Sequence, residues 1–124
     1  MNKGFGAHLT IDGRKCNQAK LSSLEHIYKV LDELPIILGM TKIMPPYVFQ
    51  YSGKVQADKG VTGFVIIAES HISIHTFTEK DHIFIDVFSC KPFDEKEALT
   101  YLLNAFEVKA YDFNCVTRGK HFPR

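Results

Sequence analysis

The stretch VTGFVIIAESHISIHTFTEKDHIFIDVFSC, residues 61–90, decides the fold of this chain. It contains three apolar runs of strand length, at 61–68, 68–77 and 82–88. The polar segment TEKD at 78–81 predicts a turn between the second and third runs. The runs on either side of this turn therefore form a hairpin, and the whole stretch predicts consecutive strands of one largely antiparallel sheet.

Two amphipathic helices flank these strands. The first is predicted to begin at Ser22, three residues before Glu25, which is the spacing of a capping box, and to end before Pro35. The second begins at the capping residue Asp94 and presents one apolar face as far as Phe106. Each helix thus has one side suited to packing on a sheet.

The remaining segments add further strands. Alternating apolar residues at 5–11 predict a strand that enters a turn at Asp12–Gly13. The segment 41–51 is extended, but Pro45–Pro46 removes two backbone donors and predicts an edge strand or a bulge. A last strand at 108–116 completes the order β-α-β-β-β-β-α-β.

This order of elements predicts an α+β fold. Two helices can cover only one face of a largely antiparallel sheet, which gives a two-layer α/β sandwich. The other face then carries no helix, and if it is apolar it must pack against something. A second copy of the same sheet is the simplest candidate, so we expect a homodimer.

Length and composition favour a single domain, residues 1–124. Fifteen Lys and Arg against fourteen Asp and Glu leave a formal charge of +1, so charge indicates neither nucleic acid nor a membrane surface as a partner. Three cysteines without CxxC spacing, in a chain that starts without a signal-peptide pattern, predict reduced thiols. Because no apolar run approaches the length of a membrane span, we expect a soluble cytoplasmic protein.

The turn at 78–81 also determines which residues lie opposite one another in the hairpin. It pairs Ser70 with Ser89 and makes Cys90 the immediate neighbour of that pair, while a slip of one residue would put Cys90 directly opposite. His75, five residues along an ideal strand, should face away from Ser70. A bend, a bulge or a partner subunit would have to bring the imidazole to the hydroxyl and the thiol.

Each of these residues also has an ordinary structural interpretation. Ser70 can end a strand, His75 can be an exposed histidine, and Cys90 can be a small apolar filler. No metal site is expected, because His71 and His75 lie about 13 Å apart along a strand. A Cys90–His75 hydrolase is not expected either, because no glycine-framed elbow or oxyanion-hole motif accompanies the pair.

The runs GVTGFVIIAESHISIHTF and DVFSC, taken together, resemble the small prokaryotic S-adenosylmethionine decarboxylase proenzymes, a pyruvoyl-dependent family of polyamine synthesis. The resemblance covers essentially the whole chain, including the closing Arg118–Gly119. It rests on the tripeptide Glu69-Ser70-His71, with His75 five residues and Cys90 twenty residues after Ser70.

The resemblance implies self-cleavage between Glu69 and Ser70, which gives a β chain of residues 1–69 and an α chain of residues 70–124. The Ser70 hydroxyl attacks the Glu69 carbonyl, the ester eliminates, and hydrolysis leaves a covalent pyruvoyl group and releases ammonia. The ketone forms a Schiff base with the α-amine of S-adenosylmethionine and accepts electrons when carbon dioxide leaves. The family uses no metal for this step.

The same resemblance implies roles for four more residues. His75 matches the processing histidine, and Thr62 stands where the family usually has a serine that helps processing. Cys90 matches the acid that reprotonates the α-carbon, and Glu79 matches a ribose-binding glutamate. In the family this site lies at a dimer interface, within a four-layer αββα sandwich built from processed αβ units.

Several points stay open from the sequence. The rings of Phe5, Tyr47 and Phe49 are candidates to stack on the substrate, although core packing is the better expectation for each of them. Similar proteins decarboxylate arginine or ornithine, and the pocket rather than the motif selects the substrate; Glu79 favours the nucleoside. An unprocessed, non-catalytic paralogue is a third possibility, against which the intact Ser70 and Cys90 argue.

Overall fold

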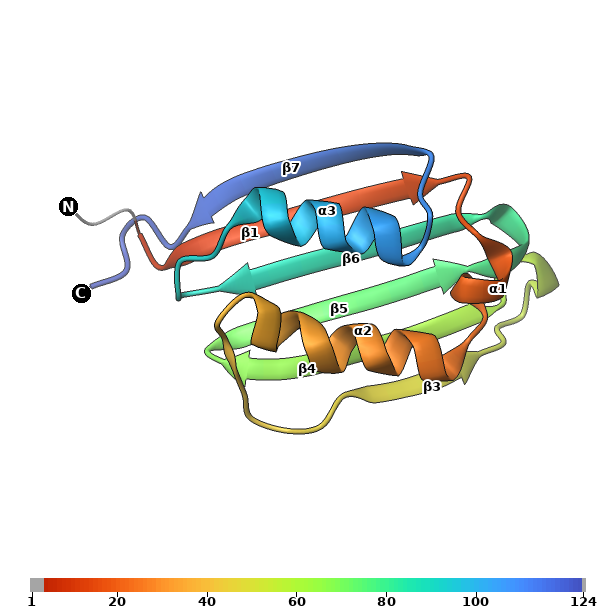
Figure 1. Ribbon diagram of the computed structural model, residues 1–124, viewed down its shortest axis with the longest axis horizontal. Helices are drawn as coiled ribbons and strands as arrows, with labels where there is room; N and C mark the ends of the chain where they lie inside the picture. The colour runs from red at the N-terminus through yellow and green to blue at the C-terminus, as the bar shows by residue number, and fades with distance from the viewer. Residues whose placement is uncertain (1–3, 124) are drawn as a thin grey trace.

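A single seven-stranded sheet organises the computed structural model, which describes residues 4–123 (Figure 1). Three α-helices and two short 3₁₀ turns accompany it within these residues. The elements in chain order are β1 (Gly6–Arg14), α1 (Gln18–Leu21), α2 (Leu24–Ile37), β2 (Thr41–Lys42), β3 (Tyr47–Tyr51), η1 (Gln56–Asp58), β4 (Gly60–Ala68), β5 (Ser70–Phe77), η2 (Thr78–Lys80), β6 (His82–Ser89), α3 (Glu95–Ala105) and β7 (Ala110–Arg118).

The strands lie in the order β2-β4-β5-β6-β1-β7, and β3 also pairs with β4. Every strand pair is antiparallel. In the β5–β6 hairpin Ser70 lies opposite Ser89 and Phe77 lies opposite His82, which confirms the register derived from the TEKD turn. The turn closes at Asp81, which has a left-handed backbone with φ of 55°.

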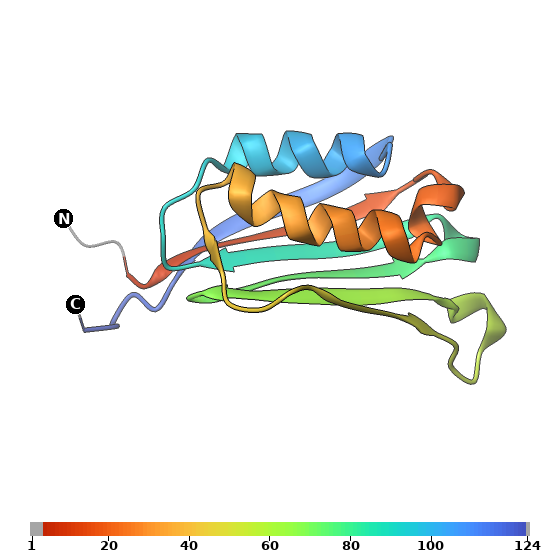
Figure 2. The same cartoon turned by 60° about the horizontal axis from the view of Figure 1, so that its bottom comes forward.

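Helices α2 and α3 lie next to each other on one face of the sheet (Figure 2), which confirms the two-layer α+β prediction. The core lies between them and the sheet, because the side chains that alternate toward the helices are fully buried. Its largest members are Leu9, Ile11, Leu21, Ile27, Leu31, Leu34, Ile67, Ile72, Ile74, Ile83, Leu102 and Phe106.

Two details of the predicted helix boundaries are wrong. Ser23, not Ser22, is the N-cap of α2, and its side chain accepts a hydrogen bond from the His26 backbone N–H at 3.0 Å. The helix also continues past Pro35 to Ile37. Because Pro35 lies in the last turn, its missing N–H removes one intrahelical bond near the end, and its buried ring packs in the core.

The strand predictions also need correction at two places. β1 does not turn at Asp12–Gly13 but runs to Arg14, and the turn falls at Lys15, where φ is 55°. The segment 41–51 forms two strands, β2 and β3, that pair with the same edge of β4 on either side of Pro45–Pro46. The prolines therefore interrupt the edge, as their missing donors indicate.

The face of the sheet opposite α2 and α3 is covered by no helix within residues 4–123, and it is rich in aromatic rings. Register places Tyr47 opposite Phe64 and His75 opposite Phe84, so these pairs of side chains share that face. We call it the open face. Its large apolar side chains are Tyr47, Phe49, Tyr51, Phe64, Ile66, Phe77, Phe84 and Phe88.

Candidate active site

The connection between β4 and β5 is a two-residue turn, Ala68–Glu69, because Ile67 pairs with Ser70. The bond between Glu69 and Ser70 is therefore at the entry to β5, where Glu69 is exposed and Ser70 half-buried. Ser70 has φ of 135°, a backbone conformation that residues with a side chain rarely adopt. Holding a residue there costs on the order of 1–3 kcal/mol, which the surrounding sheet must supply.

Cys90 lies beside this turn, at the end of β6. Its backbone N–H donates to the Glu69 carbonyl oxygen at 3.4 Å, and its thiol lies 3.6 Å from Glu69 Oε1. Gly6 lets β1 pass close to this end of β6, because a Cβ there would stand 1.9 Å from the Ser89 carbonyl oxygen and 2.7 Å from the Cys90 Cα. The predicted proximity of Ser70 and Cys90 is thus present, with Glu69 between them.

Thr62 and His75 form a second group. They lie directly opposite each other on β4 and β5, and Thr62 Oγ1 is 3.3 Å from His75 Nδ1. His75 is exposed on the open face and is five residues from Ser70 along a regular strand, a span of roughly 16 Å at about 3.3 Å per residue. Within one chain, His75 therefore does not reach Ser70.

Glu79 lies beyond His75, in the 3₁₀ turn η2 that joins β5 to β6, and it is exposed. A cavity of about 210 Å³ occupies this end of the sheet. Its lining includes Phe77 and Phe84, whose rings are 5.8 Å apart, and Phe84 is the cross-strand partner of His75. The His75 group thus has aromatic surface beside it.

The three candidate rings have different surroundings, and none belongs to the buried core. Tyr47 and Phe49 are exposed on β3 with ring centroids 5.4 Å apart. Phe5 packs on Phe88 at 5.6 Å and on Phe122 at 5.0 Å. Tyr47 and Phe49 are therefore surface aromatics, whereas Phe5 is partly buried between two other rings outside the main core.

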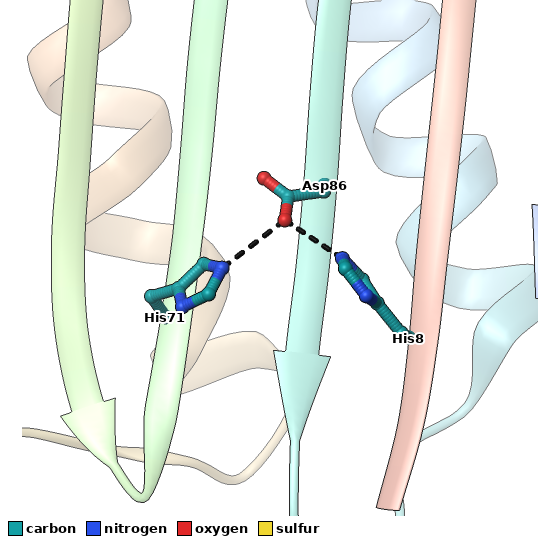
Figure 3. Close-up of side chains that lie close together, drawn as sticks. All are labelled: His8, His71 and Asp86. Carbon is teal, nitrogen blue, oxygen red and sulfur yellow. Dashed lines mark hydrogen bonds and ion pairs between the residues drawn. The ribbon is translucent and has the colours of Figure 1, made fainter. Parts of the chain in front are cut away.

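Sequence reasoning missed a polar cluster on the open face, formed by the neighbouring strands β5, β6 and β1 (Figure 3). His8 Nε2 lies 2.7 Å and His71 Nε2 lies 3.1 Å from the same oxygen, Oδ2 of Asp86. Ser73 donates a hydrogen bond to the other oxygen, Oδ1. Burial by itself raises the pKa of Asp86, but the hydrogen bonds from Ser73, His8 and His71 outweigh it and bring the pKa below its ordinary value of 3.8.

Part of this cluster can be predicted from the sequence. The TEKD register pairs Ser73 with Asp86, an acidic residue in an otherwise apolar strand. His8 could not be found this way, because its contact depends on the pairing of β1 with β6 across 78 residues.

The two other cysteines lie outside these groups. Burial, with a contribution from Asp81, raises the pKa of the Cys16 thiol to about 11. Burial and the neighbouring Glu95 likewise raise the pKa of the Cys115 thiol to about 11. Both thiols are therefore protonated and weakly nucleophilic near neutral pH.

A fold with two helices on one face of an antiparallel sheet, and with Ser70 at a positive φ beside Cys90, is shared with a class of decarboxylase proenzymes. The profile of the S-adenosylmethionine decarboxylase family matches residues 7–119. An S-adenosylmethionine decarboxylase proenzyme of Clostridium botulinum (strain Langeland) is 36% identical over 119 residues, 95% of this chain and 97% of that one. The chain belongs to the S-adenosylmethionine decarboxylase family, which is an enzyme family.

More distant comparisons agree with this assignment. A proenzyme of the same name from Thermococcus gammatolerans is 32% identical and aligns with 93% of this chain and 77% of its own. The crystal structure of the adenosylmethionine decarboxylase from Aquifex aeolicus superposes with a TM-score of 0.80 at 29% identity, covering 95% of this chain and 93% of that one. No helix within the described residues is long and apolar enough to cross a membrane.

Proposed function

We propose that this chain is a self-processing, pyruvoyl-dependent S-adenosylmethionine decarboxylase. The observation that carries the proposal is the geometry around the Glu69–Ser70 bond. Ser70 is held at φ of 135°, and the Cys90 N–H points at the carbonyl oxygen of the bond to be cut. Family membership and the proenzyme names of the relatives support the same chemistry.

Processing uses groups of the chain itself. The Ser70 Oγ attacks the Glu69 carbonyl carbon, the C–N bond breaks, and residues 69 and 70 become joined by an ester. Negative charge develops on the Glu69 carbonyl oxygen during the attack, and the Cys90 N–H stabilises it there. Loss of the Ser70 α-proton then expels the Glu69 carboxylate, and water replaces the freed nitrogen, which leaves as ammonia.

The product is a ketone at residue 70, which would serve as an electron sink for the α-amine of S-adenosylmethionine during loss of carbon dioxide. Ser70 fits this change, because breaking the Glu69–Ser70 bond and losing the Ser70 nitrogen remove the φ torsion that is costly in the uncut chain. Cys90 is the general acid that delivers a proton to the substrate carbon, a role that contributes roughly 10²- to 10⁴-fold in rate. Glu79 is proposed to bind the ribose.

We further propose that the active enzyme is a homodimer whose open faces pack together. Ser70 and Cys90 are separated from Thr62 and His75 within one chain, so a complete processing site needs the second group from elsewhere. The exposed rings of Tyr47 and Phe84 supply apolar surface for such packing. The result would be a four-layer αββα sandwich with two shared sites.

The three cysteines are free thiols, which supports a reducing cytoplasmic location.

Intact-mass analysis and a substrate panel test the catalytic proposal. The purified protein should consist of two fragments, residues 1–69 and a pyruvoyl-bearing 70–124, and should release carbon dioxide from S-adenosylmethionine but not from arginine or ornithine offered in parallel. Ser70→Ala should stay one chain and be inactive. Cys90→Ala should still cleave but decarboxylate at least about 10²-fold more slowly. An uncleaved wild-type chain, or a preference for arginine or ornithine, would refute the proposal.

Co-expression of two inactive variants tests the shared site. Ser70→Ala and His75→Ala should each fail to form the pyruvoyl group alone. In a mixed dimer the His75→Ala chain keeps Ser70 and meets the His75 of its partner, so that chain alone should be processed. If His75 acted within its own chain, no mixed dimer would be processed, and the homodimer proposal would be wrong.

A further inference from the structure

The cluster around Asp86 has the residue types of a metal site, but its hydrogen bonds indicate a different role. His8, His71 and Asp86 are the only group of possible metal ligands found within residues 4–123. His8 Nδ1, however, lies 3.2 Å from Arg118 Nη1. A guanidinium only donates hydrogen bonds, so Nδ1 must accept, and the proton of the imidazole is on Nε2, which donates to Asp86.

This proton arrangement disfavours a metal ion. A histidine that binds a metal through Nε2 donates its Nδ1–H to an acceptor, and Arg118 offers none. Instead three donors converge on one carboxylate, and Arg118 is fixed in turn by the Phe88 ring, 4.3 Å below its guanidinium carbon. We call His8, His71, Ser73, Asp86 and Arg118 the Asp86 network.

The network holds the residue next to the cleavage site. His71 follows Ser70 directly, its Nε2 lies 3.1 Å from Asp86, and its ring packs edge-on against Phe88 at 5.8 Å. The side chains of His8, Asp86 and His71 are only 19%, 22% and 39% exposed, so these contacts are partly shielded from water. The start of β5 is thereby tied to β6 and β1 through a side chain as well as through the backbone.

Self-cleavage changes what holds this end of β5. In the uncut chain, the Ala68–Glu69 turn joins β5 to β4. After cleavage residue 70 is a chain end, and chain ends fray unless they are tied down. His71 is then the first residue whose side chain anchors the strand.

We propose that His71 and Asp86 are positioning residues that hold residue 70 beside Cys90 once the chain has been cut. The inference rests on the proposed self-processing, because it assigns the network a role in the cleaved protein. It follows that the network adds little to the local order of residues 71–76 in the uncut chain, where the Ala68–Glu69 turn also holds this end of β5, and much in the cleaved one.

Hydrogen exchange of the amides at 71–76 tests this role alongside kinetics. His71→Leu removes the donor, His71→Gln keeps an N–H donor near the position of Nε2, and Asp86→Asn removes the charge. Asp12→Asn, an exposed carboxylate of the same face outside the network, is the matched control. His71→Leu and Asp86→Asn should cleave, should exchange about tenfold faster at 71–76, and should lose about tenfold in kcat with KM within about twofold. His71→Gln and Asp12→Asn should resemble the wild type.

Exchange in the uncut chain separates positioning from general stability. In a Ser70→Ala background, His71→Leu should leave the exchange rates of the amides at 71–76 within about twofold of those in the Ser70→Ala chain that keeps His71. Equal loss of protection in cut and uncut chains, or wild-type kcat in cleaved His71→Leu, would overturn the proposal. Stoichiometric zinc binding that depends on Asp86 would also overturn it. If the wild type does not cleave, the proposed function fails instead.

Discussion

The Thr62 hydroxyl contacts His75, the histidine that we propose for processing. Its Oγ1 lies 3.3 Å from His75 Nδ1, so it fixes one ring nitrogen and leaves the other free to act. Thr62→Val should slow cleavage about fivefold to tenfold, the value of one hydrogen bond of roughly 1 kcal/mol. Thr62→Ser, which keeps the hydroxyl, should cleave like the wild type. The measurement is the fraction of uncut chain over time after synthesis, and equal rates for Val and Ser would show that the hydroxyl is not used.

For single residues, the sequence predicts cross-strand neighbours better than it predicts backbone conformations. Ser70 meets Ser89 and Cys90 because the TEKD turn sets the register, and that information is local. The φ of Ser70 and the hydrogen bond from the Cys90 N–H to Glu69 depend on a turn that has no glycine, proline or asparagine to mark it. His8 reaches Asp86 only through a long-range strand pair, which no local pattern encodes.

The elements differ from their predictions mainly at their ends. Ser22 and Ser23 illustrate the cause, because the sequence allows either serine to cap α2. The backbone conformation decides between them, since Ser23 is extended, as an N-cap requires, and Ser22 is still helical. Ser23 accepts from the His26 N–H, whereas the Ser22 hydroxyl donates to the Ala19 carbonyl oxygen at 3.2 Å and finishes α1. Helix α1 itself was missed, because four residues are too few to show a helical period.

This difference between the two serines can be measured. Ser23→Ala should lower the free energy of unfolding by about 1 kcal/mol, because it leaves an N–H at the start of α2 without its partner. Ser22→Ala is the matched control and should cost less than half as much, because its exposed bond caps no N–H. Urea denaturation of the two variants in the Ser70→Ala background, where the chain stays intact, gives the comparison. A larger loss for Ser22→Ala would contradict the assigned cap.

For the whole molecule, the alternation of strands and the two helices are sufficient to predict two layers with one face left open. Alternation alone does not reveal that aromatic rings surround a charged centre on that face, because this pattern combines side chains from β1, β3, β4, β5 and β6. Asp86 thus couples strands that are distant in sequence, and its charge should affect the stability of the whole fold.

That coupling predicts how stability depends on pH. The folded-state pKa of Asp86 is lowered from 3.8, so its carboxylate stabilises the fold above about pH 4, and this contribution is lost as the pH falls through the folded-state value. Asp86→Asn should therefore be less stable than the wild type by about 1–3 kcal/mol at pH 7. The difference in stability should shrink as the pH falls below about 4, because the wild-type carboxyl becomes protonated as the pH passes through its lowered pKa. Urea denaturation at each pH, with all chains in the Ser70→Ala background and with Asp12→Asn as the control for charge on the same face, measures this difference. A difference in unfolding free energy between Asp86→Asn and the wild type that stays constant as the pH falls well below 4 would show that the loss comes from packing and not from the charge of Asp86.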